Sequence, residues 1–385
     1  MRPIRLHLDT SDFSVMYRAN PGTVEAQTRD WLKEKADSRR IEIGLSYHLI
    51  FELLQKARPM YRDDRMARAR LLSELCGQNA FPYPTDLGQG YTFSNEGLWV
   101  PRIDMEDLEI ERVVEHVMEG MARLPGINRH ERRILSKRFY FGEWLRSNPS
   151  VATDRVLEVW PLRFGHAFVE SGGFTHYLSG RMTRADANKK IRFYITDPVT
   201  VYGIWFEDYG RDDPIAERRD RLVSGFMAML DQLRRMLDAS AQLEGDIKNA
   251  FADRGERALM LNEREALMKL SSDVRSFKAE LNSPKDLYER VPKWQELFGD
   301  DSALVAAQIL YAFHRERRPI RRSDGIDFVH AMYLPHTDLW RGDKAFSDLL
   351  IKHRVNFSDR IIPSLSDVPA RVEAQLSKSG LSVAT

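Results

Sequence analysis

The middle of the chain constrains the fold most, because apolar residues recur there at helical spacing over a very long stretch. Between residues 104 and 292 this period of 3.6 continues almost without strand-like alternation. Strand-like segments occur toward the two ends, at residues 4–8, 41–46, 338–340 and 356–362. We therefore expect an α/β protein in which a sheet core with flanking helices is built from both ends of the chain.

The expected domain boundaries follow from this pattern. Residues 1–103 and 293–376 would form the two parts of the sheet core, and residues 104–292 would form an all-helical insertion with a hydrophobic core of its own. Residues 377–385 are expected to be a flexible tail. A length of 385 residues agrees with more than one compact unit.

Charge and cysteine content limit the classes of function. The chain has 58 lysines and arginines against 57 aspartates and glutamates, so its formal net charge is +1. A general basic field is absent, and binding to nucleic acid would need a local basic patch. Cys76 is the only cysteine, which excludes an intramolecular disulfide and fits a reducing cytoplasm. Apolar runs of membrane-spanning length and a secretory signal are both lacking, so we expect a soluble cytoplasmic protein without a membrane partner.

Four aspartates fall within residues 324–343, where the pattern changes from helix to strand. Helical spacing over residues 327–334 places Asp327 and His330 on one face. Pro335 would end this helix, because proline removes a backbone donor and disfavours helical geometry in the residue before it. The sequence therefore predicts an acid carried by a helix near the C-terminal strands.

A short strand and a capped helix are expected to follow. Residues 338–340 can form the strand, Gly342 the turn, and Asp343 the N-cap of a helix over residues 344–352. An acid on a helix and an acid at a strand end can converge on one cleft. Carboxylate oxygens in this arrangement suit a hard cation such as Mg²⁺, which keeps several of its waters.

The spacing of eight residues in this stretch resembles the C-terminal half of the PIN-like ribonuclease superfamily. They are Asp327, His330, Tyr333, Pro335, Asp338, Asp343, Lys344 and Phe346. Proteins of that family also carry an acid at the end of the first strand and another early in a following helix, which Asp9 and Glu52 match here. Gly342 stands where the family often has threonine. The resemblance implies a PIN-like parallel-sheet core, interrupted in this chain by the helical insertion.

A metal-dependent endoribonuclease is the activity that the resemblance implies. Asp9, Glu52, Asp327 and Asp343 would be its catalytic acids and would hold one or two Mg²⁺ or Mn²⁺ ions. Asp338 would be either a direct ligand or a support for the turn before Asp343. Bound metal lowers the pKa of an attacking water and stabilises charge on the scissile phosphate. The expected substrate is RNA, with single-stranded DNA as an alternative, and the insertion would select the substrate or bind a partner.

Candidates for holding the substrate lie beside these acids. They are Arg321, Arg322, His330 and Lys344. The two arginines end the strongest basic run of the chain, although cations at the C-terminus of a helix are also favourable without any ligand. His330 could orient a carboxylate, or it could be a packed histidine of its helix.

The sequence also permits structural roles for the acids that need no metal. Asp9 could cap the next helix, and Glu52 could lie on the exposed stripe of a helix over residues 47–55. A further stretch, residues 130–146, interleaves basic and aromatic side chains. That composition is typical of phosphate and base binding, but an amphipathic helix with snorkelling cations is the interpretation we favour.

Two other classes of function also stay open. The chain could be a catalytically inactive PIN-like protein that acts as an interaction module. Alternatively, it could be a mostly helical partner-binding protein whose match to the motif is accidental. A regulatory protein or a second copy of the chain could be the partner. Binding of Mg²⁺ or Mn²⁺ would separate the enzyme from both of these classes.

Overall fold

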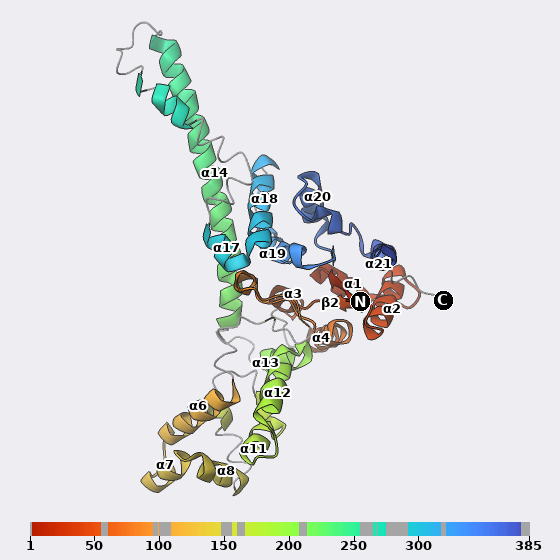
Figure 1. Cartoon of the computed structure of the whole chain (residues 1–385), viewed down its shortest axis with the longest axis vertical. Helices are drawn as coiled ribbons and strands as arrows, with labels where there is room; N and C mark the ends of the chain where they lie inside the picture. Colours follow the sequence, from red (N-terminus) through yellow and green to blue (C-terminus); the bar gives the residue numbers. More distant parts are fainter. Residues whose placement is uncertain are drawn as a thin grey trace. The chain divides into compact units, whose positions relative to one another are not determined.

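The computed structural model describes residues 2–54, 61–94, 99, 109–147, 156–159, 166–207, 214–254, 265, 266, 268–274, 292–316 and 321–378. These residues are mostly helical (Figure 1). They include a small three-stranded parallel sheet in the order β2-β1-β3. The expected mixture of strands and helices is present, with helices far in the majority. None of the helices in the described residues is both long and apolar enough to cross a membrane.

The chain divides into two compact units. Unit 1 comprises Met1–Pro3, Thr10–Tyr83 and Thr92–Asp212, and unit 2 comprises Ile4–Asp9, Pro84–Tyr91 and Asp213–Thr385. This division does not follow the expected boundaries, because the helical middle of the chain is shared between the two units. Every element assigned in the described part of that middle is a helix, as expected.

Two neighbouring strands of unit 2 come from opposite ends of the chain. β1 (Ile4–His7) pairs in parallel with β3 (Leu339–Trp340), with Leu6 opposite Leu339 and His7 opposite Trp340. Arg5 and His7 alternate with apolar residues in β1, yet His7 is fully buried at 0% exposure and Arg5 is half-buried. Burial on both faces is typical of a parallel strand. The third strand, β2 (Ile41–Ile43), belongs to unit 1.

Helices and short 3₁₀ turns complete unit 2. They are α14 (Pro214–Arg254), α17 (Pro292–Phe298), α18 (Asp300–Glu316), α19 (Arg322–Ala331), α20 (Lys344–Lys352), α21 (Val368–Lys378), η2 (Pro84–Gln89), η4 (Leu334–His336), η5 (Ser358–Arg360) and η6 (Leu365–Asp367). α20 has the predicted bounds, whereas α19 begins and ends earlier than the helix predicted over residues 327–334. The strand predicted at residues 356–362 is reduced to one bridge between Trp340 and Ile361, because η5 turns the chain just before it.

Helix α14 packs against α18 and α19. Phe226 of α14 stacks on Phe328 with ring centroids 3.8 Å apart and meets Phe313 edge-on at 6.3 Å. Gly325 permits this close approach, since a Cβ atom there would lie only 2.7 Å from the side chain of Val223. The second half of the expected insertion therefore shares its core with the C-terminal helices.

Unit 1 is built from eleven helices of the described chain and β2. The helices are α1 (Thr10–Arg18), α2 (Val24–Asp37), α3 (Tyr47–Leu54), α4 (Arg62–Cys76), α6 (Ile110–Arg123), α7 (Arg129–Leu135), α8 (Arg138–Ser147), α10 (His166–Glu170), α11 (Gly173–Leu178), α12 (Arg184–Thr196) and α13 (Pro198–Glu207). α4 contacts α1, α2, α3 and α13. We call α6 to α13 the helical part of unit 1 (yellow to light green in Figure 1). Its buried side chains, among them Val117, Phe141, Phe174 and Ile191, form a hydrophobic core within this part of the chain.

Candidate functional site

Asp9 and Asp343 lie at the same edge of the strand pair formed by β1 and β3. The strands run in parallel, with His7 opposite Trp340. Continuing this register by two residues places Asp9 opposite Gly342, the residue before Asp343. Asp9 is buried, at 7% exposure, whereas Asp343 is exposed. The fold therefore brings two acids from opposite ends of the chain to the carboxyl edge of one strand pair.

The turn before Asp343 explains why glycine occupies position 342. A Cβ atom on Gly342 would overlap the indole ring of Trp340, so threonine does not fit there. Asp343 caps α20 as predicted, and its Oδ1 accepts a hydrogen bond from the backbone N–H of Phe346 at 3.1 Å. A carboxylate has about four acceptor positions, so one such bond leaves it able to accept a further ligand.

Helix α19 carries two acids one turn apart, Asp324 and Asp327. Asp324 is fully buried, and its Oδ2 accepts a hydrogen bond from the backbone N–H of Arg321 at 2.6 Å, which stabilises the first turn of the helix. Asp327 is half-buried. Sequence reasoning selected Asp327 by its motif spacing and gave Asp324 no role. Across the described residues, no three or more histidine, cysteine, aspartate or glutamate side chains form a group that could hold a metal ion.

Glu52 belongs to α3 of unit 1, whereas the predicted site aspartates belong to unit 2. The Glu52 side chain is half-buried and accepts a hydrogen bond from Thr10 Oγ1 at 2.5 Å. Its neighbours Ile50 and Phe51 are buried. Glu52 is therefore held by a specific polar contact and does not lie on a fully exposed stripe of the helix.

Asp338 lies at the other end of the strand pair from Asp343. Its Oδ2 accepts a hydrogen bond from the backbone N–H of Arg5, and its own N–H donates to the carbonyl of Arg5, both at 2.9 Å. These two bonds fix the start of β3 beside β1. The expectation that Asp338 binds the same metal or supports the Asp343 turn is not favoured by this position, because β3 separates the two residues.

Sequence reasoning missed the role of His7, which forms a buried pair with His330. His7 Nδ1 lies 3.1 Å from the carbonyl oxygen of Arg341, and His7 Nε2 lies 3.2 Å from His330 Nδ1. A carbonyl oxygen only accepts, so Nδ1 of His7 carries the proton and donates. In the neutral ring Nε2 then accepts a hydrogen bond from His330 Nδ1–H. The signal in the sequence was a histidine between the buried Leu6 and Leu8 of a strand.

Aromatic rings enclose this histidine pair. The His7 ring stacks on Trp340 at a centroid distance of 5.7 Å and on Tyr333 at 6.3 Å. Trp340 Nε1–H donates to the carbonyl oxygen of His330 at 3.2 Å. Burial lowers the pKa of His7 to about 3, and the neighbouring His330 also lowers it. His7 is therefore neutral at physiological pH, and the motif residues His330 and Tyr333 pack the sheet edge from inside.

The predicted substrate-binding residues have different surroundings. His330 is 1% exposed, so its side chain does not reach solvent, and the packed-histidine interpretation holds. Arg321 and Lys344 are exposed, at the starts of α19 and α20. The side chain of Arg322 lies outside the described ones. Two of the four candidates, Arg321 and Lys344, are therefore accessible to a ligand.

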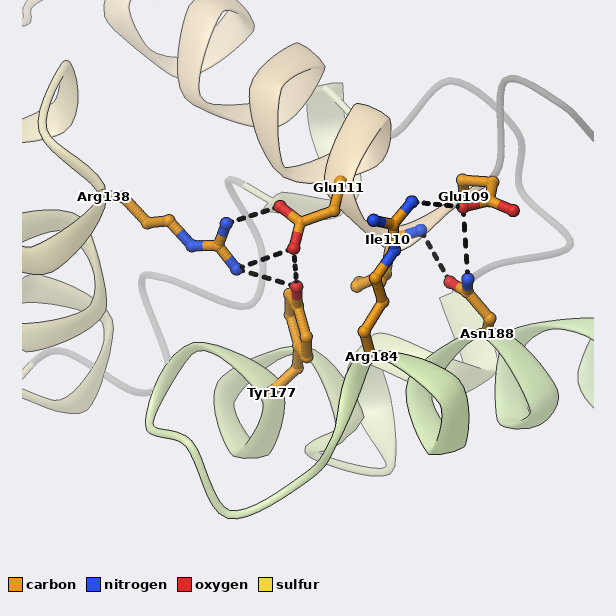
Figure 2. Close-up of polar contacts among 7 residues, drawn as sticks. All are labelled: Glu109, Ile110, Glu111, Arg138, Tyr177, Arg184 and Asn188. Carbon is orange, nitrogen blue, oxygen red and sulfur yellow. Dashed lines mark hydrogen bonds and ion pairs between the residues drawn. The ribbon is translucent and has the colours of Figure 1, made fainter.

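A second polar cluster lies in the helical part of unit 1 and joins three helices (Figure 2). Arg138 of α8 donates to both carboxylate oxygens of Glu111 of α6, and also to the Tyr177 hydroxyl of α11 at 2.8 Å. Tyr177 donates in turn to Glu111. These hydrogen bonds lower the pKa of Glu111, and the bond to Glu111 raises the pKa of Arg138. Arg138 is therefore engaged by protein groups, which weighs against it as a phosphate ligand.

The same cluster continues at the start of α6. Arg184 and Asn188 of α12 donate to Oε2 of Glu109 at 2.8 and 3.3 Å (Figure 2). Asn188 Oδ1 accepts a hydrogen bond from the backbone N–H of Ile110 at 2.9 Å. The hydrogen bond from Arg184 lowers the pKa of Glu109. These contacts satisfy a helix N-terminus and hold α12 against α6, so we assign the cluster a structural role.

Comparison with known proteins identifies no relative of this chain. No protein-family model matches the chain, and neither a curated protein nor a solved structure matches it significantly. The resemblance to PIN-like ribonucleases thus depends on the spacing of the motif residues and on the placement of Asp9 and Asp343. Those two acids, at the carboxyl edge of a parallel strand pair, define the candidate functional site of this chain.

Proposed function

We propose that the chain is a metal-dependent nuclease of the PIN-like type that hydrolyses phosphodiester bonds in RNA. The observation that carries the proposal is the placement of Asp9 and Asp343 at one edge of the β1–β3 pair. Ligands of open α/β sheets bind outside the carboxyl ends of the strands, which is the edge that holds these acids. Asp327 of α19, which lies in the same unit, is a further acid of the proposed site.

Carboxylate oxygens are the donors that Mg²⁺ and Mn²⁺ prefer. Mg²⁺ is usually bound through one or two protein carboxylates, and waters and substrate phosphates complete its shell. Asp9 and Asp343 therefore fit the ion by donor type and number. When bound, the ion would lower the pKa of an attacking water. The cap bond from Phe346 orients Asp343, and the burial of Asp9 restricts its rotamers. Lys344 is exposed next to Asp343 and would contact a phosphate of the substrate.

A catalytically inactive interaction module is the second candidate function. It is supported by the structural hydrogen bonds of three acids between residues 324 and 343: Asp324 at the start of α19, Asp338 at the start of β3, and Asp343 at the start of α20. In this case the role of the acids is to stabilise the starts of these elements by hydrogen bonds. The two candidates differ in whether the chain binds a divalent cation.

Asp343→Asn tests the proposal, because asparagine caps a helix about as well as aspartate but removes the charge. We expect the variant to fold normally, to lose Mn²⁺ binding in titration calorimetry, and to cleave a labelled single-stranded RNA at least about 1,000-fold more slowly. Asp197→Asn is a matched control in unit 1, since Asp197 also accepts a hydrogen bond from the backbone three residues ahead, at Thr200. Wild-type protein that neither binds Mn²⁺ nor cleaves RNA would favour the inactive module.

A further inference from the structure

One surface of the helical part of unit 1 carries cations without acidic partners. Arg129, Arg132 and Arg133 lie on α7, and Lys137 follows in the turn before α8. All four side chains are exposed, and none makes an ion pair or side-chain hydrogen bond within the described part of the chain. Arg132 and Arg133 follow Arg129 by three and four residues, so each lies beside Arg129 on the helix surface and their like charges repel.

Arginines of the neighbouring helices α6 and α8 have carboxylate partners. Arg123 pairs with Glu119, Arg138 with Glu111, and Arg146 with Glu143. The missing partners on α7 are therefore a local property and not a general shortage of acids. We call Arg129, Arg132, Arg133 and Lys137 the α7 basic surface.

The acid within α7 is engaged at the start of the helix. Glu131 Oε2 accepts a hydrogen bond from the backbone N–H of Asn128 at 3.0 Å, and Asn128 Oδ1 accepts one from the N–H of Glu131 at 2.9 Å. This capping box turns the carboxylate toward the helix terminus. Among the described side chains, Glu131 therefore forms no ion pair with the α7 cations, and a bound anion would reduce the repulsion among them.

The α7 basic surface is held on a packed scaffold. Leu135 of α7 and Phe141 and Leu145 of α8 are buried, whereas the four cations are exposed. The bonds of Arg138 to Glu111 and Tyr177 fix the start of α8 against α6 and α11 (Figure 2). Cations on a fixed element can contact several charges of a linear anion at once.

The chemistry beside the cations favours a single-stranded nucleic acid as the anion. Lys137 Nζ lies 5.7 Å from the centroid of the Tyr140 ring, which is 50% exposed. Cations interleaved with an accessible aromatic ring suit a strand whose phosphates and base faces are both available. A membrane surface fits less well, because a membrane-binding helix turns apolar side chains outward, whereas Leu135 of α7 is buried.

We propose that the α7 basic surface binds the phosphate backbone of single-stranded RNA, with Tyr140 as a stacking platform for a base. The choice of RNA over single-stranded DNA rests on the proposed nuclease function, while the binding chemistry itself requires phosphates and an unpaired base. The surface would supply affinity for the strand without sequence selection, since phosphate contacts carry no base information.

The test measures RNA binding separately from cleavage. Anisotropy of a labelled single-stranded 20-mer is titrated in EDTA at several salt concentrations, with wild type and the triple variant Arg129→Gln, Arg132→Gln, Arg133→Gln. Each neutralised phosphate of a single strand contributes about 0.7 to the salt slope, so the slope should fall by about 2. We expect affinity at moderate salt to fall at least tenfold. Cleavage assays with Mg²⁺ report on the proposed nuclease activity alone, so binding without cleavage contradicts the nuclease but not this surface.

A matched control tests whether RNA binding depends on the α7 basic surface or only on the net charge of the protein. Lys189, Lys190 and Arg192 of α12 lie in the same unit, and their replacement by glutamine changes the net charge by the same amount. An equal loss of affinity in this α12 variant would overturn the proposal. The proposal would also be overturned if the triple variant lost more affinity for anionic lipid vesicles or for an acidic peptide than for RNA. If the triple variant does not fold by circular dichroism, Lys137→Gln with Tyr140→Ala must weaken RNA binding, and an unchanged affinity rejects the surface.

Discussion

The strand edge of unit 2 and the helical part of unit 1 both join segments that are distant in the sequence, but their polar contacts differ in charge. At the strand edge, His7 and His330 are buried among aromatic rings, and His7 is neutral. In the helical part, Glu111 and Arg138 are partly exposed and bind each other as ions. Moving a charge from water into the protein interior costs free energy, so the buried histidine is neutral. A partly exposed ion pair keeps much of its hydration, so Glu111 and Arg138 can stay charged.

The two regions should therefore respond to different conditions. Stability that depends on a neutral buried histidine changes with pH, and stability that depends on exposed ion pairs changes with salt. The strand edge also holds Asp9 and Asp343 of the proposed site, so substitutions of these acids should affect cleavage. Substitutions in the helical part should leave the chemistry of cleavage unchanged.

The largest expected effect comes from Asp327→Asn in α19. If Asp327 contributes to metal binding, the rate of RNA cleavage should fall by orders of magnitude, while the free energy of unfolding without metal changes by less than about 1 kcal/mol. Glu111→Gln in the helical part should leave the cleavage rate per folded molecule unchanged. Single-turnover assays and urea unfolding measure both. A variant that unfolds early yet cleaves normally per folded molecule would contradict the assignment of Asp327.

Gly342→Thr should give the next largest effect, now on stability. The new side chain would overlap the ring of Trp340, and overpacking of this kind costs about 1–3 kcal/mol. Gly203→Ala in α13 is the control, because a Cβ there meets no atom within 4 Å and alanine favours a helix. Thermal unfolding should show a lowered midpoint for the first variant only. Equal stability of Gly342→Thr and wild type would show that the strand edge is less tightly packed than described.

An effect of similar size is expected from pH at the strand edge. The pKa of His7 is about 3 in the folded protein and near 6.5 when unfolded, so the unfolded state binds the extra proton first. The stability that neutral His7 contributes is complete above pH 6.5 and is lost as the pH falls toward 3, by about 1.4 kcal/mol per pH unit. Urea unfolding from pH 7 to pH 5 should show this loss, and His7→Phe should show a shallower pH dependence. Identical slopes for both proteins would exclude a neutral buried His7.

The smallest effect is expected from Glu111→Gln in the helical part. Glutamine keeps an acceptor for Tyr177 but removes the ion pair with Arg138, and exposed pairs contribute about 0–1 kcal/mol. The loss in the free energy of unfolding should shrink further at 1 M salt, where exposed charges are screened. Loss of several kcal/mol, independent of salt, would show that this pair behaves like a buried one and would remove the contrast between the two regions.

Some features of the proposed site follow from residues within a few positions of each other. Helix α20 has the bounds predicted from its sequence, and Asp343 caps it, because an N-cap depends on one side chain and the next turn of backbone. The long helical middle was likewise predicted from its period, since each helix satisfies its own backbone hydrogen bonds. The strand predicted at 356–362 is reduced to one bridge at Ile361, because the 3₁₀ turn η5 (Ser358–Arg360) interrupts the extended backbone just before it.

The sequence by itself determined the helices, the cap at Asp343 and the short strand after Thr337, because these depend on local hydrogen bonds and apolar spacing. Only the tertiary structure decided that β1 pairs with β3, which buries His7 against His330 and places Asp9 and Asp343 at one edge. It also decided that Asp338 holds the start of β3 and that α14 packs with the C-terminal helices. Each of these outcomes requires contact between residues far apart in the chain, and no local pattern specifies which distant partner a buried side chain will meet.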